Sequence, residues 1–113
     1  LDWKTAMKKS INVFGLETKI EMIEIDESLN ALALFEPANK RIVLDPRSES
    51  LFQDYCHELF HLFWYRTGMR QYVVDQHVEE IIAENFSVLM TENLKDIVAM
   101  HTYTVKKKKK KIK

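Results

Sequence analysis

The sequence contains a single cysteine, Cys56, among 113 residues. One cysteine cannot form a disulfide within the chain, so the composition fits a reducing compartment. No apolar run approaches the roughly 20 residues that a transmembrane helix needs, and we therefore expect no contact with a membrane. Residues 1–10 are charged and amphipathic, which is not the pattern of a secretory signal peptide. These absences together predict a cytoplasmic protein.

The sequence also lacks internal repeats and any sign of a second domain. A length of 113 residues fits one domain with a hydrophobic core of its own. We expect residues 1–104 to form that domain. Residues 105–113 are expected to be a disordered basic tail, because blocks of like charge usually stay solvated.

The chain has no net charge, but its charges are unevenly distributed. Seven of the seventeen basic residues lie in residues 105–113, which leaves ten basic and seventeen acidic residues, a net of −7, in the rest. A nucleic-acid-binding domain normally carries basic residues on a folded face, so specific recognition of nucleic acid is not expected. The six lysines from Lys106 to Lys111 allow only a weak nonspecific contact with RNA, DNA or an acidic partner.

The first half of the chain predicts one helix and three strands. Apolar residues at helical spacing indicate a helix over residues 2–14, with Gly15 as its C-terminal cap. The strands are expected over residues 18–25, 31–35 and 41–45. The turn residues Pro37 and Asn39 join the last two strands into a hairpin. The strand at 41–44 either offers an open edge to an extended peptide or is paired or covered.

Two long helices are expected in the second half. The first covers residues 51–66, with Ser50 as a candidate N-cap. Its broad apolar stripe consists of Phe52, Cys56, Leu59, Phe60 and Phe63. The second begins after the N-cap Asp75 and runs to about Met100, and its expected buried stripe consists of Val78, Ile82, Phe86 and Leu89. The predicted fold class is α+β, with a small antiparallel or mixed three-stranded sheet packed on the first of these helices.

The most informative pattern is His57-Glu58-Leu59-Phe60-His61, which has the form H-E-x-x-H. Residues four apart lie on one face of a helix, so both imidazoles can bind one metal ion. Glu58 points about 100° round the helix, where it can reach a metal-bound water without being a ligand. Zn²⁺ prefers such nitrogen donors and lowers the pKa of its bound water to about 7. Glu58 can then carry that proton to a leaving amine.

Catalytic zinc usually has a third protein ligand, and Glu80 is the best candidate. In an antiparallel pair of helices, residues equidistant from the connection come level. His61 lies five residues before the helix end at Arg66, and Glu80 lies five residues after Asp75. One turn further, Glu84 should come level with His57 and accept a hydrogen bond from its other nitrogen. Glu79 is the main competitor as third ligand, because a one-residue phase error would favour it, and His77 is a weaker one.

These residues resemble the zincin metallopeptidases. Residues 55–63 fit the extended zincin signature, and Glu80-Ile81-Ile82-Ala83-Glu84-Asn85-Phe86-Ser87 is similar to the E-x-x-A-N-x-F-A helix of ImmA/IrrE-type metallopeptidases and of small phage and bacterial zincin-like proteins. Residues 35–46 look like the hairpin before their motif helix. The resemblance covers roughly residues 17 to 96.

The resemblance implies a minimal zincin-like domain of gluzincin type, in a bacterial cell or phage-infected host. It implies zinc bound by His57, His61 and Glu80, Glu58 as general base and acid, and Glu84 behind the ligands. The chain departs from ImmA/IrrE proteins at Phe60, where they have a small residue, and at Glu84, where they have Asn. It also lacks the methionine-proline that often ends their last helix, and it has no attached DNA-binding domain.

We therefore expect a zinc metallopeptidase acting on a protein or peptide substrate. The alternatives are a zinc-binding regulatory domain that cleaves nothing, and a helical interaction module without metal. The pattern does not indicate an oligomeric state. Side chains that could steady the oxyanion are Tyr65, Arg66, Arg70, Tyr72, His77, His101 and Tyr103. Trp64 is expected to be a packing residue that lines the cleft, and Cys56 to be a buried, inert thiol.

Overall fold

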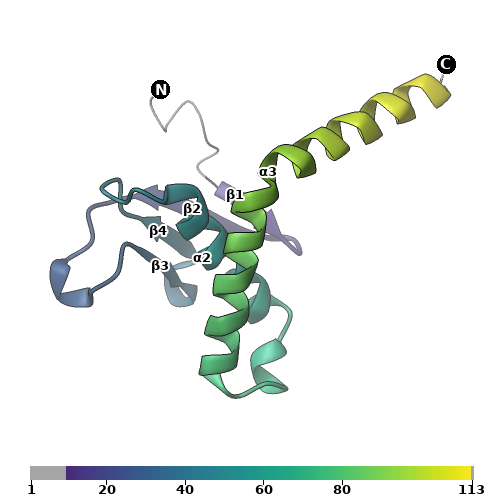
Figure 1. Ribbon diagram of the computed structural model, residues 1–113. Coiled ribbons are helices and arrows are strands. Elements are labelled where there is room, and N and C mark those ends of the chain that lie inside the picture. Colours follow the sequence, from purple (N-terminus) through teal and green to yellow (C-terminus); the bar gives the residue numbers. More distant parts are fainter. Residues whose placement is uncertain (1–9, 113) are drawn as a thin grey trace.

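The computed structural model describes residues 10–112, which form an α+β fold with one mixed sheet. The strands are β1 (Ser10–Val13), β2 (Leu16–Met22), β3 (Ala33–Glu36) and β4 (Arg41–Leu44). Their order in the sheet is β1-β2-β4-β3, in which β2 and β4 are parallel and the other pairs antiparallel. The sheet thus has one strand more than expected. Helix α2 (Leu51–Arg66) packs against it, and α3 (Gln76–Ile112) packs on α2 (Figure 1).

The additional strand is β1, which lies where the end of a helix was predicted. Ile11 and Val13 also fit the two-residue period of a strand, and both pack against the core. Phe14 and Gly15 connect β1 to β2 with φ values of 51° and 81°, and two-residue hairpin turns favour positive φ at both positions. Gly15 therefore serves a hairpin and not a helix C-cap. The rest of the predicted helix, residues 2–9, lies outside the described residues.

The predicted hairpin of β3 and β4 is confirmed, with a short 3₁₀ turn at Pro37–Asn39 between the strands. Strand β4 lies between β2 and β3, so it offers no open edge. The edge strands of the sheet are β1 and β3. Of the two alternatives for residues 41–44, an open edge and a paired one, the structure has the paired one, because β2 pairs with β4 across a long connection that no local pattern reveals.

A buried carboxylate secures the chain between β4 and α2. Asp45 is fully buried and accepts hydrogen bonds from the backbone N–H of Ile25, at 2.9 Å, and from the Arg47 guanidinium. These Arg47 hydrogen bonds hold the pKa of Asp45 well below its usual range. Ser50 occupies the N-cap position of α2 but makes no capping hydrogen bond with its side chain.

The bounds of the predicted motif helix agree with α2, but its core-facing side differs from the one expected. Leu62 is 1% exposed and packs with Ile20, Ile42 and Leu44 of the sheet. Leu51, Tyr55 and Leu59 support this cluster from the same helix. Phe63, expected in the buried stripe, is 41% exposed. The sheet therefore receives the Leu62 side of α2, while the phenylalanines lie toward its flank.

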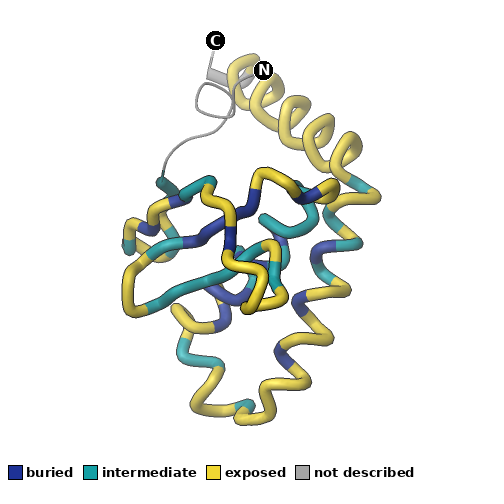
Figure 2. The backbone as a smooth tube through the Cα atoms, turned by 90° about the vertical axis from the view of Figure 1, so that its left-hand side faces the viewer, coloured by how far each residue is buried: buried dark blue, intermediate teal, exposed yellow. Residues whose placement is uncertain are grey.

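Helix α3 differs from the prediction in both phase and length. Its buried residues are Glu79, Ala83 and Ser87, whereas the expected stripe is largely exposed, with Ile82 at 38% and Leu89 at 58%. The helix continues to Ile112 instead of ending near Met100, so the segment predicted as a disordered tail is helical as far as that residue. Figure 2 shows this last part of α3 as exposed backbone away from the sheet. Within residues 10–112, no helix combines the length and apolarity needed to cross a membrane.

Candidate metal centre

Both histidines of α2 direct their Nε2 atoms toward the carboxylate of Glu80 on α3. His57 Nε2 lies 3.1 Å from Glu80 Oε2, and His61 Nε2 lies 2.8 Å from Glu80 Oε1. One ligand atom from each of the three residues lies within 4.8 Å of the other two. This arrangement is compatible with a metal site. The three residues expected as ligands are therefore brought together.

The antiparallel packing of α2 and α3 places these residues at matching heights. Glu80 reaches His61, and one turn further along α3 the Glu84 Oε2 atom lies 3.1 Å from His57 Nδ1. Gln53 also donates to Glu84, at 3.2 Å. The expected positions of Glu80 and Glu84 are both confirmed, because distance from the interhelical connection determines the level of each residue.

Glu79 lies against the Nδ1 atom of His61, a position that the sequence did not reveal. Its carboxylate is buried, lies 2.5 Å from His61 Nδ1 and accepts hydrogen bonds from Arg70 at 3.0 and 3.1 Å. Burial by itself would raise the pKa of Glu79, but the hydrogen bonds from Arg70 and His61 outweigh it and lower that pKa. Glu79 does not replace Glu80. It supports His61 from behind, as Glu84 supports His57.

Each histidine thus has a carboxylate at Nδ1 and Glu80 at Nε2. A carboxylate that accepts the Nδ1 hydrogen favours the tautomer whose Nε2 lone pair is free for a metal, and it makes that nitrogen a stronger donor. The donor set of the site is two such nitrogens and one carboxylate, which suits a catalytic zinc ion. The signal for Glu79 in the sequence was its position one residue before Glu80. We interpreted the two residues as alternatives for the role of third ligand.

Glu58 lies beside the ligands and is 7% exposed. Among the residues that the structure describes, its buried Oε2 atom has no hydrogen-bond partner. Burial raises the pKa of Glu58, with a smaller opposing effect from His61 and His57. A buried carboxylate oxygen without a partner is costly unless water or a ligand reaches it. One oxygen of the Glu58 carboxylate is therefore available to a hydrogen-bond donor beside the two histidines.

Glu58, His61 and Glu80 line a cleft of about 320 Å³. Leu34 and Phe35 of the edge strand β3 form part of the same wall. The cleft therefore joins the polar side chains of α2 and α3 to β3, an edge strand among the described residues.

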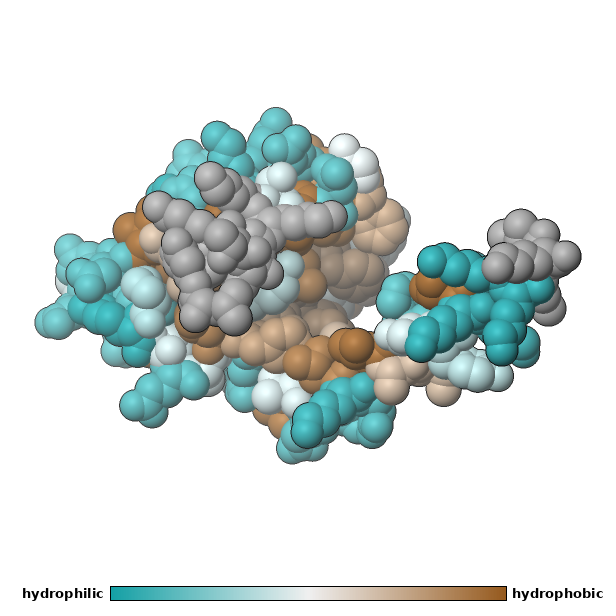
Figure 3. Space-filling model, turned by 90° about the horizontal axis from the view of Figure 1, so that it is seen from above, coloured by the Kyte–Doolittle hydropathy of each residue, from teal (hydrophilic) through white to brown (hydrophobic). Residues whose placement is uncertain are grey.

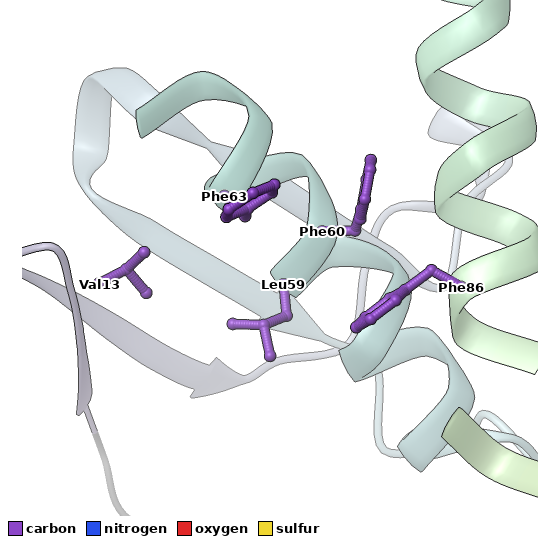
Figure 4. A pocket seen from close by; sticks show the side chains of 5 residues that line it. All are labelled: Val13, Leu59, Phe60, Phe63 and Phe86. Carbon is purple, nitrogen blue, oxygen red and sulfur yellow. The ribbon is translucent and has the colours of Figure 1, made fainter. Parts of the chain in front are cut away.

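A second cavity, of about 340 Å³, is lined only by apolar side chains and shares no lining residue with the cleft. Figure 4 shows Leu59, Phe60 and Phe63 of α2 around it, together with Val13 of β1 and Phe86 of α3. It contains no group that could transfer a proton or bind a metal. The polar cleft is therefore the candidate functional site.

Of the side chains considered for the oxyanion, only Arg70 lines the cleft. Tyr65 lies under the Arg70 guanidinium, at 5.5 Å from ring centroid to carbon, and Arg66 instead donates to the backbone oxygen of Phe14. Tyr72 is 81% exposed. His77 is also exposed, at the start of α3. His101 and Tyr103 follow Glu80 by more than twenty helical residues, about 30 Å along α3.

Trp64, three residues after His61, and Cys56, directly before His57, are both buried. Trp64 packs against Phe60, with ring centroids 5.5 Å apart, and it does not line the cleft. Cys56 is 2% exposed, and burial raises the pKa of its thiol. The predicted burial of Cys56 is confirmed. A thiol with a raised pKa is a poor metal ligand, because the thiolate is the form that binds.

Comparisons with models of protein families, with curated proteins and with solved structures found no match to this chain. The functional assignment therefore depends on the side chains of the cleft and their geometry.

Proposed function

We propose that the protein is a zinc-dependent peptidase of zincin type, with His57, His61 and Glu80 as the metal ligands. The observation that carries the proposal is the joint arrangement of three convergent ligands and one buried, unpartnered carboxylate, Glu58. The fit of residues 55–63 to the zincin signature and the similarity of residues 80–87 to a helix of ImmA/IrrE-type metallopeptidases support the same reaction.

When bound, zinc would acidify a water molecule and polarise the carbonyl of the scissile peptide bond. Glu58 would accept a proton from the attacking water on its carboxylate oxygen as the water oxygen bonds to the carbonyl carbon. It transfers that proton to the nitrogen of the leaving amine as the C–N bond breaks. Burial raises the pKa of Glu58, and this direction favours uptake of the proton by its carboxylate.

The supporting carboxylates orient the two imidazoles. Glu84 and Glu79 hold the Nδ1 atoms of His57 and His61, so that both Nε2 atoms converge on one point. Arg70 fixes Glu79 by two hydrogen bonds and lies in the wall of the cleft. A guanidinium at this position can also stabilise negative charge on the substrate oxygen.

We further propose that the substrate is an extended segment of a protein or peptide. Strand β3 is an edge of the sheet, and Leu34 and Phe35 from it border the cleft. The unpaired backbone groups of an edge strand can hydrogen-bond an extended chain, which would then lie across the ligands.

The variant Glu58→Gln tests the role of the proton carrier. It should keep about one zinc per chain, since Glu58 is not a ligand, and lose hydrolysis of an unstructured protein such as casein. Glu49→Gln, an exposed substitution just before α2, is the matched control and should retain activity. Zinc content is measured by elemental analysis, and cleavage is followed with and without a chelator.

A parent protein that binds zinc but cleaves none of a broad peptide library would contradict the peptidase and leave a zinc-binding domain in its place. Absence of zinc at neutral pH, with His57→Ala equal to the parent in metal content, would contradict the metal centre itself.

A further inference from the structure

The guanidinium of Arg70 is held in a fixed orientation in the wall of the cleft. Arg70 belongs to the short 3₁₀ turn Met69–Gln71 between α2 and α3. Its guanidinium carbon lies over the ring of Tyr65, at 5.5 Å from the ring centroid. Its Nε and Nη2 atoms donate to the two oxygens of the Glu79 carboxylate, at 3.0 and 3.1 Å. Packing on one face and two hydrogen bonds along one edge therefore leave the group little freedom to turn.

This arrangement leaves the outer edge of the guanidinium, between Nη1 and Nη2, without a partner among the described residues. Arginine carries five N–H groups in a planar fork, and Glu79 accepts two of them. The outer edge keeps a parallel pair of N–H groups, and 44% of the Arg70 side chain is exposed. A carboxylate can accept both hydrogen bonds of such a pair at once.

No lysine or second arginine lines the cleft in the part of the chain that the structure describes. Its other ionisable lining residues are Glu58, His61, Glu79 and Glu80. Gln76, the first residue of α3, also lines the cleft, and its side-chain amide can donate a hydrogen bond. A negatively charged group of a substrate would therefore meet a cationic side chain at Arg70 and carboxylates elsewhere along the wall.

The lysines of α3 do not reach the cleft. Lys106 follows Glu80 by more than twenty-five helical residues, about 40 Å along the helix. Figure 3 shows this end of α3 extending away from the body, with mostly hydrophilic surface toward its end. Among the described side chains, the permanent positive charge beside the candidate ligands is therefore that of Arg70.

We propose that Arg70 is the specificity-determining residue of the cleft and selects a substrate with a carboxylate close to the scissile bond. The outer edge of its guanidinium donates two hydrogen bonds to that carboxylate, while the inner edge stays on Glu79. The carboxylate lies close to the scissile bond because Glu79 contacts both Arg70 and the candidate ligand His61. It belongs to an acidic side chain or to the C-terminus of the peptide, which offer the same two oxygens. This substrate class deepens the proposed peptidase function and depends on it.

Pairs of peptides that differ in one carboxylate test the selection. A peptide that the parent cleaves is made with Glu or with Gln at each position near the scissile bond, and with a free or an amidated C-terminus. At one position the Glu form should have a kcat/KM about tenfold above that of the Gln form, the lower end of what hydrogen bonds to a charged group contribute, because Arg70 is partly exposed. If the C-terminal carboxylate is the ligand, the free and amidated peptides should show that ratio instead.

Substitutions of Arg70 should change this ratio. Arg70→Gln should bring it to about one, because the charged pair of donors is lost. The change also disturbs Glu79 and His61, but a loss of zinc slows both peptides alike and leaves their ratio unaltered. Arg70→Lys keeps the charge without the paired donors and should retain part of the ratio. Arg66→Gln is the matched control and should keep all of it, since Arg66 is exposed and donates to the backbone of Phe14.

Binding gives a readout that does not depend on turnover. Calorimetric titration of the same peptide pair into zinc-loaded Glu58→Gln, which should bind without cleaving, should give a Kd ratio similar to the ratio of kcat/KM. Adding Arg70→Gln to that variant should remove the ratio.

Equal cleavage of the paired peptides at every position by the parent would overturn the assignment of Arg70 and leave the peptidase standing. A ratio that persists in Arg70→Gln, with both peptides slowed alike, would limit Arg70 to holding Glu79 and stabilising the substrate oxygen. A parent that binds zinc but cleaves no peptide would contradict the proposed function, and the selection with it.

Discussion

At the scale of single residues, the two histidines of α2 have unequal support. The His57 side chain is 20% exposed, and its carboxylate partner Glu84 is 57% exposed. The His61 side chain is 10% exposed, and its partner Glu79 is 6% exposed and held by Arg70. Hydrogen bonds in a less solvated place are stronger and costlier to lose. We therefore expect His61 to be the more rigidly held ligand.

This difference predicts an order of zinc affinities. Glu80→Ala removes a ligand and should weaken zinc binding most. Loss of a hydrogen-bond partner behind a ligand typically costs about 10- to 100-fold in metal affinity. Glu79→Ala should lie near the upper end of this range, and Glu84→Ala near the lower end. Competition with a chromophoric chelator measures all three affinities. A Glu79→Ala affinity equal to that of the parent would contradict the support assigned to His61.

At the scale of elements, the face of α3 that meets α2 is lined by small residues. Ala83 and Ser87 are both fully buried between the helices. Small side chains let two helices approach closely, and this approach allows Glu80 to bridge both imidazoles. The large apolar residues Ile81 and Ile82 lie beside the contact and are 48% and 38% exposed.

Substitutions at adjacent positions of α3 test this packing. Ala83→Leu inserts three carbons into a closed contact and should destabilise the fold by about 1–3 kcal/mol. Ile82→Ala at a partly exposed site should cost less than about 1 kcal/mol. Urea unfolding of both variants measures the free energies. The reverse order would indicate that α3 buries the Ile82 face, as its apolar pattern suggested.

At the scale of the whole molecule, the candidate metal centre joins the two long helices. Two ligands lie on α2 and one on α3, so a bound ion would act as a link between elements otherwise held by side-chain packing. Ligands that bind only the native state stabilise it by mass action. Removal of the metal should therefore affect the stability of the whole fold and not of the cleft alone.

The expected effect of metal removal on unfolding is large. Zinc at about a thousand times its Kd contributes roughly 4 kcal/mol, so a chelator should lower the Tm by several degrees. Glu58→Gln should keep this zinc-dependent shift, and His57→Ala should lose most of it. Scanning calorimetry with and without chelator provides the comparison. An equal shift in parent and His57→Ala would mean that the metal binds elsewhere.

Much of the site follows from the sequence alone, because it depends on properties within one element or at a fixed distance from one turn. The spacing of His57 and His61 determines that they share a face of α2. Their distance from the connection to α3 determines that Glu80 and Glu84 come level with them. The bounds of α2 and the hairpin of β3 and β4 were likewise encoded in local periodicity and turn residues.

Only the tertiary structure decided which faces are buried and which strands meet. Ile11 fits the helical spacing of residues 2–14, Ile11 and Val13 together fit the two-residue period of a strand, and pairing with β2 selects the strand. β4 is internal because β2, distant in sequence, joins it. The rotation of α3 about its axis depends on where α2 offers room, so Glu79 and Ala83 are buried in place of Ile82. Packing against a partner far along the chain leaves no periodic signal in either segment, and for this reason the support of His61 by Glu79 emerged only in three dimensions.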